Sequence, residues 1–306
     1  MVSLKQIRYA LAVEEFLHFK KAAESCAISQ SALSTAITDM EKQLGFAVFE
    51  RDNKKVLITP LGKQVLTYAK NIYLQMNDLT SLAGQMLCPL SSTLSIGMIP
   101  TIAPFILPLM LPPIKTHYPK LDLRVEEDQS HILVRKVLEG QLDCAILALP
   151  YDCSGLLSFS FWQENFYLVT HKDDRLSTKQ CVTAKELGRS NLMLLKDGHC
   201  FKDHALKVCG MESDSGYETG GTSLSTLIQL VAGNLGTTLV PEMALEQLVN
   251  LNPHLSAIPI DEPGPHREIA FIVRPNYPGL ENIEILKQLI RDELNRLGSD
   301  DRQSRT

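Results

Sequence analysis

Two cysteines, Cys200 and Cys209, lie nine positions apart in a short segment that also holds His199, Lys202 and His204. These residue types allow three interpretations: a reactive thiol beside cations, a metal site, or two ordinary cysteines on a helix. The metal site is the weakest of the three, because the segment lacks the CxxC and HxxxH spacings of common zinc sites. We therefore expect no metal and no cofactor.

The neighbours of Cys200 are those that would activate a thiol. The thiolate is the nucleophile toward a peroxide, and an ordinary cysteine is mostly protonated at neutral pH. Asp203 can cap a helix that begins at the next residue, with Cys200 just ahead of the helix's positive end. Lys202 and His199 add positive charge. A sulfenic acid formed on Cys200 could then be resolved by Cys209 as a disulfide.

The nine-residue spacing also determines how the structure would have to change to form such a disulfide. Along one helix, nine residues rise about 13.5 Å and turn about 900°, so the two sulfurs would lie on opposite faces. A disulfide requires Cα atoms about 4.4–6.8 Å apart. Segment 200–209 would therefore have to refold to form the bond, which would turn a redox event into a two-state structural switch.

The elements that must position this segment belong to a chain of ordinary globular composition, with 306 residues, 44% hydrophobic and 21% charged. The net charge of −5 does not indicate nucleic acid binding, although residues 1–87 carry 10 Lys and Arg against 8 Asp and Glu. No apolar run reaches the roughly 18 residues that cross a bilayer. The acid-containing N-terminus does not resemble a signal peptide. We expect a cytoplasmic protein with seven mostly reduced cysteines.

The N-terminal residues predict a helix-turn-helix. Apolar residues at helical spacing over 4–19 indicate a first helix, and Ala22, Ala23 and Cys26 continue the apolar stripe. Ser29 is a good N-cap for the next helix, which Gly45 would end. The expected core face of that helix consists of Leu33, Ile37, Met40 and Leu44.

The exposed start of this second helix is suited to contacts with DNA. Its polar residues are Gln30, Ser31, Ser34 and Thr35. The N-terminal end of a recognition helix reaches base edges in the major groove, where Gln can read adenine. Two β-prone runs around a basic turn predict a wing, in which Arg51, Lys54 and Lys55 could contact phosphate. A solvated helical bundle would show the same pattern, so the pattern alone leaves both interpretations open.

A heptad repeat follows the wing. Its apolar positions are Val65, Ala69, Ile72, Met76, Leu79, Ala83 and Met86. Alternating steps of four and three residues over about three heptads predict supercoiling with a partner helix, so we expect dimerisation through 65–86. The alternative is an amphipathic helix lying on its own domain. This helix should end near Cys88-Pro89, and "PLSST" would be the linker.

Beyond the linker, short strand-like runs alternate with helical patterns. The expected strands are "LSIGM", "LDLRVEE", "CAILAL", "FYLVT", "NLMLL", "GTTLV" and "IAFIV", and the expected helices cover 131–140, 203–209, 223–233 and 281–297. Such alternation predicts mainly parallel α/β sheets. About 210 residues are too many for one small sheet, so we expect two lobes. The strand in "REIAFIVRP" and the last helix should return to the first lobe.

The N-terminal motifs resemble the winged helix-turn-helix of LysR-type transcriptional regulators. The family pattern has Ala-Ala, then Ser-Gln-x-x-Leu-Ser, Leu-Glu-x-x-Leu-Gly, Phe-x-Arg and Thr-x-x-Gly. The corresponding residues here are Ala22-Ala23, 29–34, 40–45, 49–51 and 59–62. Ser31 replaces a usual proline and Ala36 a common polar residue, so we expect the preferred operator to differ from that of other members. The resemblance implies that the long helix pairs two chains and that the α/β lobes bind an effector.

The cysteine segment narrows this resemblance to the peroxide-sensing branch of the family. The similarity covers essentially the whole chain, although Lys196 and His204 stand where an acidic residue and a glutamine are expected. It implies that peroxide oxidises Cys200 and that Cys209 resolves the product. It also implies a peroxide pocket of Thr101, Ser130, His199 and Arg267. Without the family, each of these would be an unremarkable surface or capping residue.

The sequence thus predicts an α/β regulatory domain of two lobes, periplasmic-binding-protein-like, with an N-terminal all-α winged helix-turn-helix and a long linker helix. We expect the DNA-binding domain at 1–62, the linker helix and hinge at 63–91, and the redox-sensing domain at 92–306. Lobe I would comprise 92–163 and 268–306, and lobe II 164–267.

The expected function is that of a peroxide-sensing transcription regulator, not an enzyme. The expected partners are double-stranded DNA, a second copy of the chain, hydrogen peroxide as the signal and RNA polymerase as a candidate, with no membrane. The family resemblance implies a tetramer through pairing of the lobes. Two rival functions remain: a LysR-type regulator that senses a small metabolite, and a thiol peroxidase. The winged helix pattern argues against the enzyme.

Overall fold

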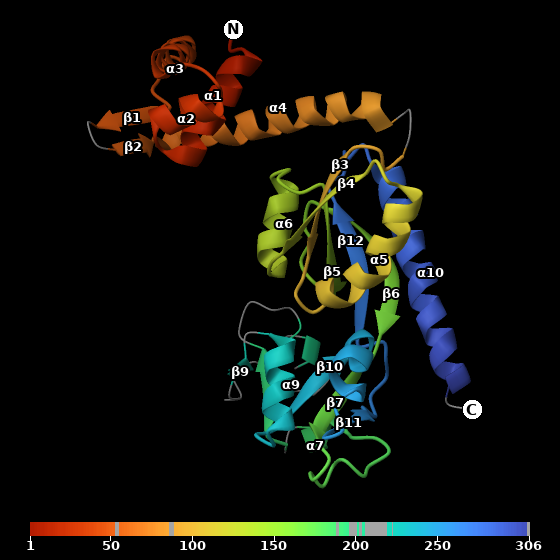
Figure 1. The fold of residues 1–306 in the computed structure, drawn as a ribbon. Coiled ribbons are helices and arrows are strands. Elements are labelled where there is room, and N and C mark those ends of the chain that lie inside the picture. The colour runs from red at the N-terminus through yellow and green to blue at the C-terminus, as the bar shows by residue number, and fades with distance from the viewer. Residues whose placement is uncertain are drawn as a thin grey trace. The chain divides into compact units, whose positions relative to one another are not determined.

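The computed structural model describes residues 1–52, 55–85, 89–187, 190–195, 201, 204–205, 219–221 and 223–304. The chain divides into two compact units, Met1–Ala83 and Gly84–Thr306 (Figure 1). We call them the DNA-binding unit and the regulatory unit after the functions that the sequence predicts for them, and each is described by itself. No helix in the described ranges is long and apolar enough to span a membrane.

The DNA-binding unit consists of helices and one short hairpin. Its elements are α1 (Leu4–Phe16), α2 (Phe19–Ser25), α3 (Gln30–Leu44), β1 (Phe49–Asp52), β2 (Lys55–Ile58) and α4 (Pro60–Gln85). The single helix expected over 4–19 is wrong, because Leu17 adopts a left-handed conformation with φ 45° and ends α1. The chain then turns and begins α2, whose buried Ala22 and Ala23 allow close helix packing.

Helix α3 begins and ends as the sequence predicts. The Ser29 side chain accepts a hydrogen bond from the backbone N–H of Ala32, which satisfies one of the unpaired donors at the helix start. Gly45 ends the helix in a left-handed conformation with φ 82°, which glycine adopts without a steric penalty. Leu33, Ile37 and Met40 are buried, as expected for the core face, and they pack with residues of α1, α2 and α4.

The regulatory unit contains two β-sheets with helices packed on them. The first lobe has α5 (Ala103–His117), α6 (Ser130–Leu138) and α10 (Leu280–Ser304), together with β3 (Thr93–Met98), β4 (Asp122–Glu127), β5 (Cys144–Leu149), β6 (Leu157–Glu164) and β12 (Arg267–Val273). In the described residues its strand order is β4-β3-β5-β12-β6. Strand β12 and helix α10 thus return to the lobe in which β3 starts (Figure 1).

The second lobe is built from the residues between β6 and β12. Its elements are β7 (Phe166–His171), α7 (Ala184–Leu187), β8 (Leu192–Leu195), β9 (Thr219–Gly221), α9 (Leu224–Ala232), β10 (Thr237–Pro241), η1 (Glu242–Ala244), η2 (Glu246–Asn250) and β11 (Leu255–Pro259). The described strands follow the order β11-β7-β10-β8-β9. The chain crosses between the lobes twice, from β6 into β7 and again at the start of β12.

Both sheets are mixed, so the expectation of mainly parallel sheets is wrong in part. Strands β3, β4 and β5 are parallel, whereas β12 runs antiparallel to both β5 and β6. In the second lobe β7 is antiparallel to β10 and β11. Two of the antiparallel strands, β6 and β11, are sheet edges that were not expected from the sequence. The other two, β7 and β12, were expected, but their direction follows from where the chain crosses between the lobes, which no local pattern gives.

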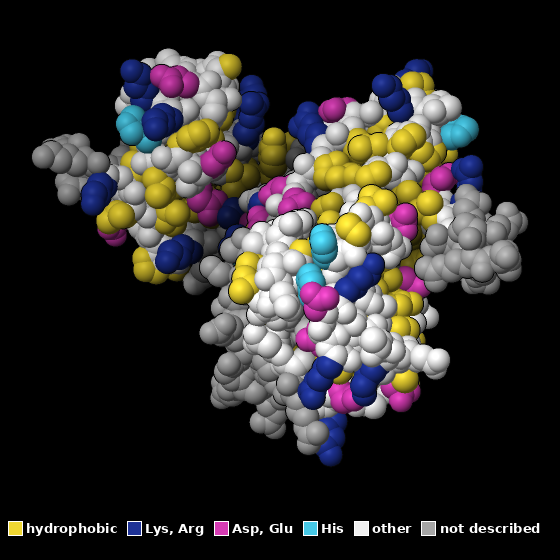
Figure 2. Space-filling view, turned by 60° about the horizontal axis from the view of Figure 1, so that its bottom comes forward, with side chains coloured by type: hydrophobic (Ala, Val, Ile, Leu, Met, Phe, Trp, Pro, Cys, Tyr) yellow, Lys and Arg dark blue, Asp and Glu magenta, His cyan; other side chains and the backbone are white. Residues whose placement is uncertain are grey.

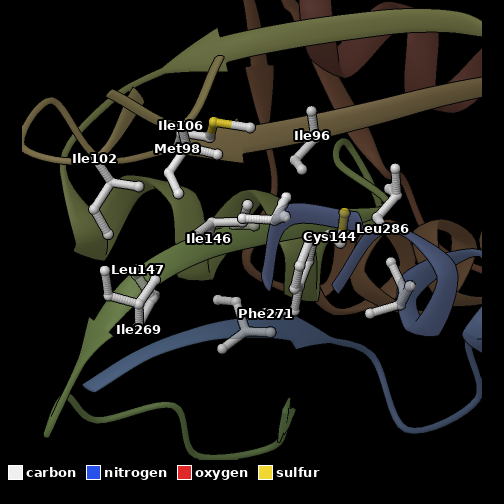
Figure 3. Packing of buried hydrophobic residues seen from close by; sticks show 14 of the residues in the cluster. Ile96, Met98, Ile102, Ile106, Cys144, Ile146, Leu147, Ile269, Phe271 and Leu286 are labelled. Atoms are coloured by element: carbon white, nitrogen blue, oxygen red, sulfur yellow. The ribbon is translucent and has the colours of Figure 1, made fainter. Parts of the chain in front are cut away.

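Helix α5 was also not expected, because Pro108, Pro112 and Pro113 lie inside it. Proline has no backbone N–H to donate, and it is therefore disfavoured in the interior of a helix. Burial of the apolar face of α5 outweighs this cost here, since Phe105, Ile106 and Met110 are all buried. The core of the first lobe packs the face of its sheet against α5 and α10, and Figure 3 shows Cys144 among these apolar side chains.

Candidate functional site

The candidate recognition surface of the DNA-binding unit lies at the start of α3. Gln30, Ser31 and Thr35 are exposed, and Ser34 is half-buried. The hydroxyls of Ser29 and Ser31 lie 3.1 Å apart, so the capping residue also contacts a candidate reading residue. The structure therefore places the four candidate residues of α3 on or beside the solvent-facing side of the helix. The hydrogen-bonding groups of the three exposed residues are accessible.

The wing is the β1–β2 hairpin. Arg51 pairs with Val56 in the antiparallel register, so its backbone belongs to the hairpin. Its side chain lies outside the part of the chain that is described, and so does Lys54. The wing is fastened to α3 by Glu41, whose carboxylate accepts hydrogen bonds from the backbone N–H groups of Val48 and Phe49 at 2.8 and 3.0 Å.

In the regulatory unit, Arg267 is the centre of a buried polar cluster. Its Nε donates to Oε1 of Glu164 at 2.7 Å, and its Nη2 lies 2.6 Å from the same oxygen. Its Nη1 donates to the Thr101 hydroxyl at 3.0 Å, and its Nη2 also donates to the Thr101 carbonyl at 3.2 Å. A guanidinium has five N–H groups, so a second N–H on Nη1 has no acceptor among the described residues.

Glu164 connects this cluster to the second lobe. Its Oε2 accepts a hydrogen bond from the backbone N–H of Met243 at 2.9 Å. Burial raises the pKa of the Glu164 carboxyl, and the nearby charge of Arg267 opposes that rise. Every hydrogen bond described at this carboxyl is one it accepts, which fits its ionised form. Glu164 ends β6 and Arg267 begins β12, so the pair sits where both strands cross between the lobes.

Two aromatic rings enclose the guanidinium of Arg267. The Phe166 and Phe201 ring centres lie 5.8 and 5.9 Å from the guanidinium carbon and 5.0 Å from each other. Arginine stacks favourably on aromatic faces, and the rings keep water away from the ion pair. Phe201 is 1% exposed and immediately follows Cys200 in the sequence. The buried cluster is thus joined directly to the segment that holds the candidate reactive thiol.

Thr101 and Ser130 lie at the same end of the first sheet. Strands β3 and β4 are parallel neighbours, and each residue follows its strand by three positions. Ser130 is 1% exposed and opens α6, and its hydroxyl oxygen has no partner within the described residues. His204 also contacts this end of the sheet. Its Nε2 lies 3.0 Å from the carbonyl oxygen of Pro150, which follows β5 directly.

The remaining candidate residues cannot be placed. His199, Cys200 and Cys209 lie outside the described residues, so the redox pair and the histidine of the expected pocket stay predictions. Of the other cysteines with described positions, Cys26 and Cys144 are buried, Cys153 is half-buried and Cys181 is exposed. Burial raises the pKa of the Cys144 thiol well above its ordinary value, so this thiol should be unreactive.

Sequence reasoning missed three members of the cluster, Glu164, Phe166 and Phe201. The available signal was a charged residue at the edge of a strand: "WQENFYL" places Glu164 beside an apolar run, as "HREIAFI" does Arg267. A charge in such a position needs a partner when it is buried. The partner could not be identified, because the residues are 103 positions apart.

Comparison with known proteins gives two family matches. Residues 4–63 match the bacterial regulatory helix-turn-helix protein, lysR family, and residues 89–295 match the LysR substrate binding domain. The chain is 38% identical to the HTH-type transcriptional regulator EstR of Acinetobacter baylyi over 94% of this chain and 96% of that protein. It is 36% identical to a probable hydrogen peroxide-inducible genes activator of Streptomyces viridosporus, over 95% and 94% of the respective chains.

A solved structure of similar architecture is that of a full-length OxyR variant from Pseudomonas aeruginosa. The TM-score is 0.77 at 30% identity, with 95% of this chain and 98% of that chain covered. The agreement in fold therefore extends over both units of the chain.

Proposed function

The chain belongs to the LysR family of bacterial DNA-binding transcriptional regulators, and from this premise we propose that its regulatory unit senses hydrogen peroxide through Cys200 and Cys209. The family consists of regulators rather than enzymes. The observation that carries the proposal is the buried Arg267 cluster, whose Phe201 ring is contributed by the residue after Cys200. The name of the Streptomyces relative, a probable hydrogen peroxide-inducible genes activator, supports the same signal.

The cluster offers the donors that peroxide reduction requires. The Thr101 hydroxyl accepts from Arg267, so its own hydrogen can be donated to a peroxide oxygen. The Ser130 hydroxyl and the remaining N–H on Nη1 of Arg267 are further donors at the same end of the sheet. We propose that His199, the remaining residue of the expected pocket, completes this set. Such preorganised donors stabilise the charge that develops as the O–O bond breaks.

The proposed chemistry has two balanced steps. The Cys200 thiolate attacks one oxygen of hydrogen peroxide, an S–O bond forms, and the other oxygen leaves as hydroxide, which takes a proton and becomes water. The Cys209 thiol then attacks the sulfenic acid, which releases a second water and leaves a disulfide. The two sulfurs are oxidised and the peroxide is reduced. Because one helix cannot hold this bond, residues about 200–209 would refold and release Phe201 from the cluster.

Thiol mapping under non-reducing conditions tests this proposal. With one equivalent of peroxide, the wild type is expected to form the Cys200–Cys209 disulfide. Cys209→Ser should instead accumulate a sulfenic acid that dimedone traps on Cys200, and Cys200→Ser should lose the peroxide response. Cys181 is the matched control, because it is exposed but has no such cluster described around it. Oxidation of Cys181 or Cys26 as fast as that of Cys200 would contradict the assignment.

A second candidate function rests on the similarity to EstR, whose name mentions no peroxide. In that case the regulatory unit would respond to a small-molecule effector without a redox switch. The two functions differ in one measurement. In the peroxide sensor, peroxide treatment would change the affinity for DNA, and Cys200→Ser would abolish that change. In an effector-sensing regulator, peroxide would leave the affinity for DNA unchanged in both the wild type and the variant. Stoichiometric rather than catalytic consumption of peroxide would exclude a thiol peroxidase.

DNA recognition should depend on Gln30. We expect Gln30→Ala to weaken binding to a cognate duplex by about 1–3 kcal/mol and to a scrambled duplex much less, because a glutamine that reads a base contributes sequence-specific contacts. Arg51→Ala is the control. It should weaken both duplexes about equally and lower the salt slope by about one phosphate contact. A salt-titrated binding assay measures both effects. Equal loss for Gln30→Ala on both duplexes would mean that Gln30 only positions the protein.

We further propose the assembly and the setting of the regulator. The DNA-binding domain would span 1–62, the linker helix 63–91 and the regulatory domain 92–306, with a dimer through 65–86 and a tetramer through the regulatory units. On the face drawn in Figure 2, hydrophobic side chains gather on the regulatory unit, which favours pairing of that unit. A protein that acts on bacterial DNA works in the cytoplasm, where RNA polymerase is its candidate partner.

A further inference from the structure

We infer that Glu164 is the positioning residue of the sensor: it holds the guanidinium of Arg267 against Thr101 and cancels the arginine's charge. This inference rests on the proposed function, because it assigns how the same site is regulated. It goes beyond that function by naming a residue that touches neither the peroxide nor the reactive sulfur.

The orientation of Arg267 follows from its contacts with Glu164. Nε and Nη2 both approach Oε1, at 2.7 and 2.6 Å, and this fixes the plane of the guanidinium. The opposite edge, Nη1, is thereby directed at the Thr101 hydroxyl at 3.0 Å. Without the carboxylate, the two aromatic rings would still stack on the guanidinium, but they would not fix its rotation within the plane. The second N–H on Nη1, which has no acceptor among the described residues, would then lose its direction.

Glu164 is itself held rigidly. Its second oxygen accepts the backbone N–H of Met243, which belongs to η1 of the second lobe. Its side chain is 1% exposed and that of Arg267 is 0% exposed, so water screens neither charge. The carboxylate therefore ties the arginine to both lobes, at the point where β6 and β12 cross between them.

The charge balance of the cluster also depends on Glu164. One carboxylate beside one guanidinium leaves no net charge in the buried cluster, so Arg267 would act through directed N–H groups rather than as a free cation. Without the Glu164 carboxylate, Arg267 would be an unpaired cation, and it would lower the pKa of the Cys200 thiol more than the neutral pair does. Two further titratable groups approach the pair. Glu242 on η1 raises the pKa of Glu164, and His266, which precedes β12, has its own pKa lowered by burial. The thiol in question, Cys200, and the titratable His204 both belong to the segment that follows β8.

This division of roles predicts two separable effects for Glu164→Gln, measured in the full-length Cys209→Ser protein. The amide keeps the side-chain size but removes the charge. The pKa of the Cys200 thiol should fall, so that alkylation by iodoacetamide below the wild-type pKa becomes several-fold faster. At a pH where the thiol is fully ionised, the rate with hydrogen peroxide should fall at least tenfold. The amide has one acceptor oxygen, so it cannot accept from both Arg267 and the Met243 N–H, and the donors of Arg267 lose their fixed alignment. A merely structural role would not move these two rates in opposite directions.

Glu164→Asp separates positioning from charge and serves where Glu164→Gln does not fold. It keeps the charge but withdraws the carboxylate by one methylene. We expect a several-fold slower peroxide reaction with an unchanged thiol pKa. An unchanged peroxide rate in either variant, or an unchanged thiol pKa in Glu164→Gln, would overturn the inference. A wild-type Cys200 that does not react with peroxide at all would instead overturn the proposed function.

Discussion

Replacing Arg267 with methionine is expected to lower the free energy of unfolding of the regulatory unit by about 3–5 kcal/mol, the usual cost of removing one partner of a buried ion pair. The Glu164 carboxylate would remain in the interior without its cation. Methionine is flexible and can fill part of the space, so the loss reports mainly the charge. Urea denaturation followed by Trp162 fluorescence measures it, since Trp162 is the one tryptophan of the chain and lies on β6.

A double variant provides the matched control for this prediction. Arg267→Met combined with Glu164→Leu removes both charges and should recover much of the lost stability, because buried ion pairs can often be replaced by apolar residues. If the double variant is as unstable as the single one, the loss comes from packing rather than from the uncompensated carboxylate.

The stability loss of Arg267→Met should also depend on pH. Burial raises the pKa of Glu164, and in the variant the arginine no longer opposes that rise. A carboxyl whose pKa is higher in the folded protein than in the unfolded chain binds its proton more tightly when folded. Stability therefore falls as the pH rises from the unfolded pKa to the folded one. The variant should be closer to the wild type at pH 5 than at pH 8, and an equal loss at both would contradict this explanation.

The second large effect is expected for Ile72→Lys combined with Leu79→Lys, which should convert the proposed dimer into monomers. The first turns of α4 belong to the DNA-binding unit, since Leu66 and Ala69 are buried and Lys70 pairs with Glu14 at 2.9 Å. Farther along, Ile72 and Leu79 are 44% and 69% exposed within one chain. Burying them in a partner helix would be favourable, and lysine at either position would oppose it.

Loss of the dimer should weaken operator binding by about 10²–10⁴-fold, because the second head no longer binds as part of the same molecule. Sedimentation and a DNA-binding titration measure the two effects. The control is Asn71→Lys with Gln75→Lys, which adds the same charge to exposed polar positions of the same helix. An unchanged oligomer in the Ile72 and Leu79 variant would mean that the helix packs elsewhere.

Much of the fold could be predicted where one local signal decides an element. Ser29 and Gly45 set the limits of α3, and the strands expected as "CAILAL" and "IAFIV" form β5 and β12. The prediction failed where tertiary packing outweighs local preference. Three prolines concealed α5, and a left-handed Leu17 divides what reads as one helix. Strand β6 was missed although the alternation of apolar and polar residues in "LSFSFWQE" is the pattern of a half-buried strand.

The candidate site divides in the same way. The sequence by itself determined the polar start of α3, the heptad repeat and the nine-residue spacing of the two cysteines, because each depends on neighbours along one segment. Only the tertiary structure decided that Arg267 meets Glu164, 103 positions away, and Thr101, 166 positions away. A buried charge requires a partner, but which carboxylate and which hydroxyl serve depends on the register of β12 against β6 and on the end of β3, and no local pattern records either.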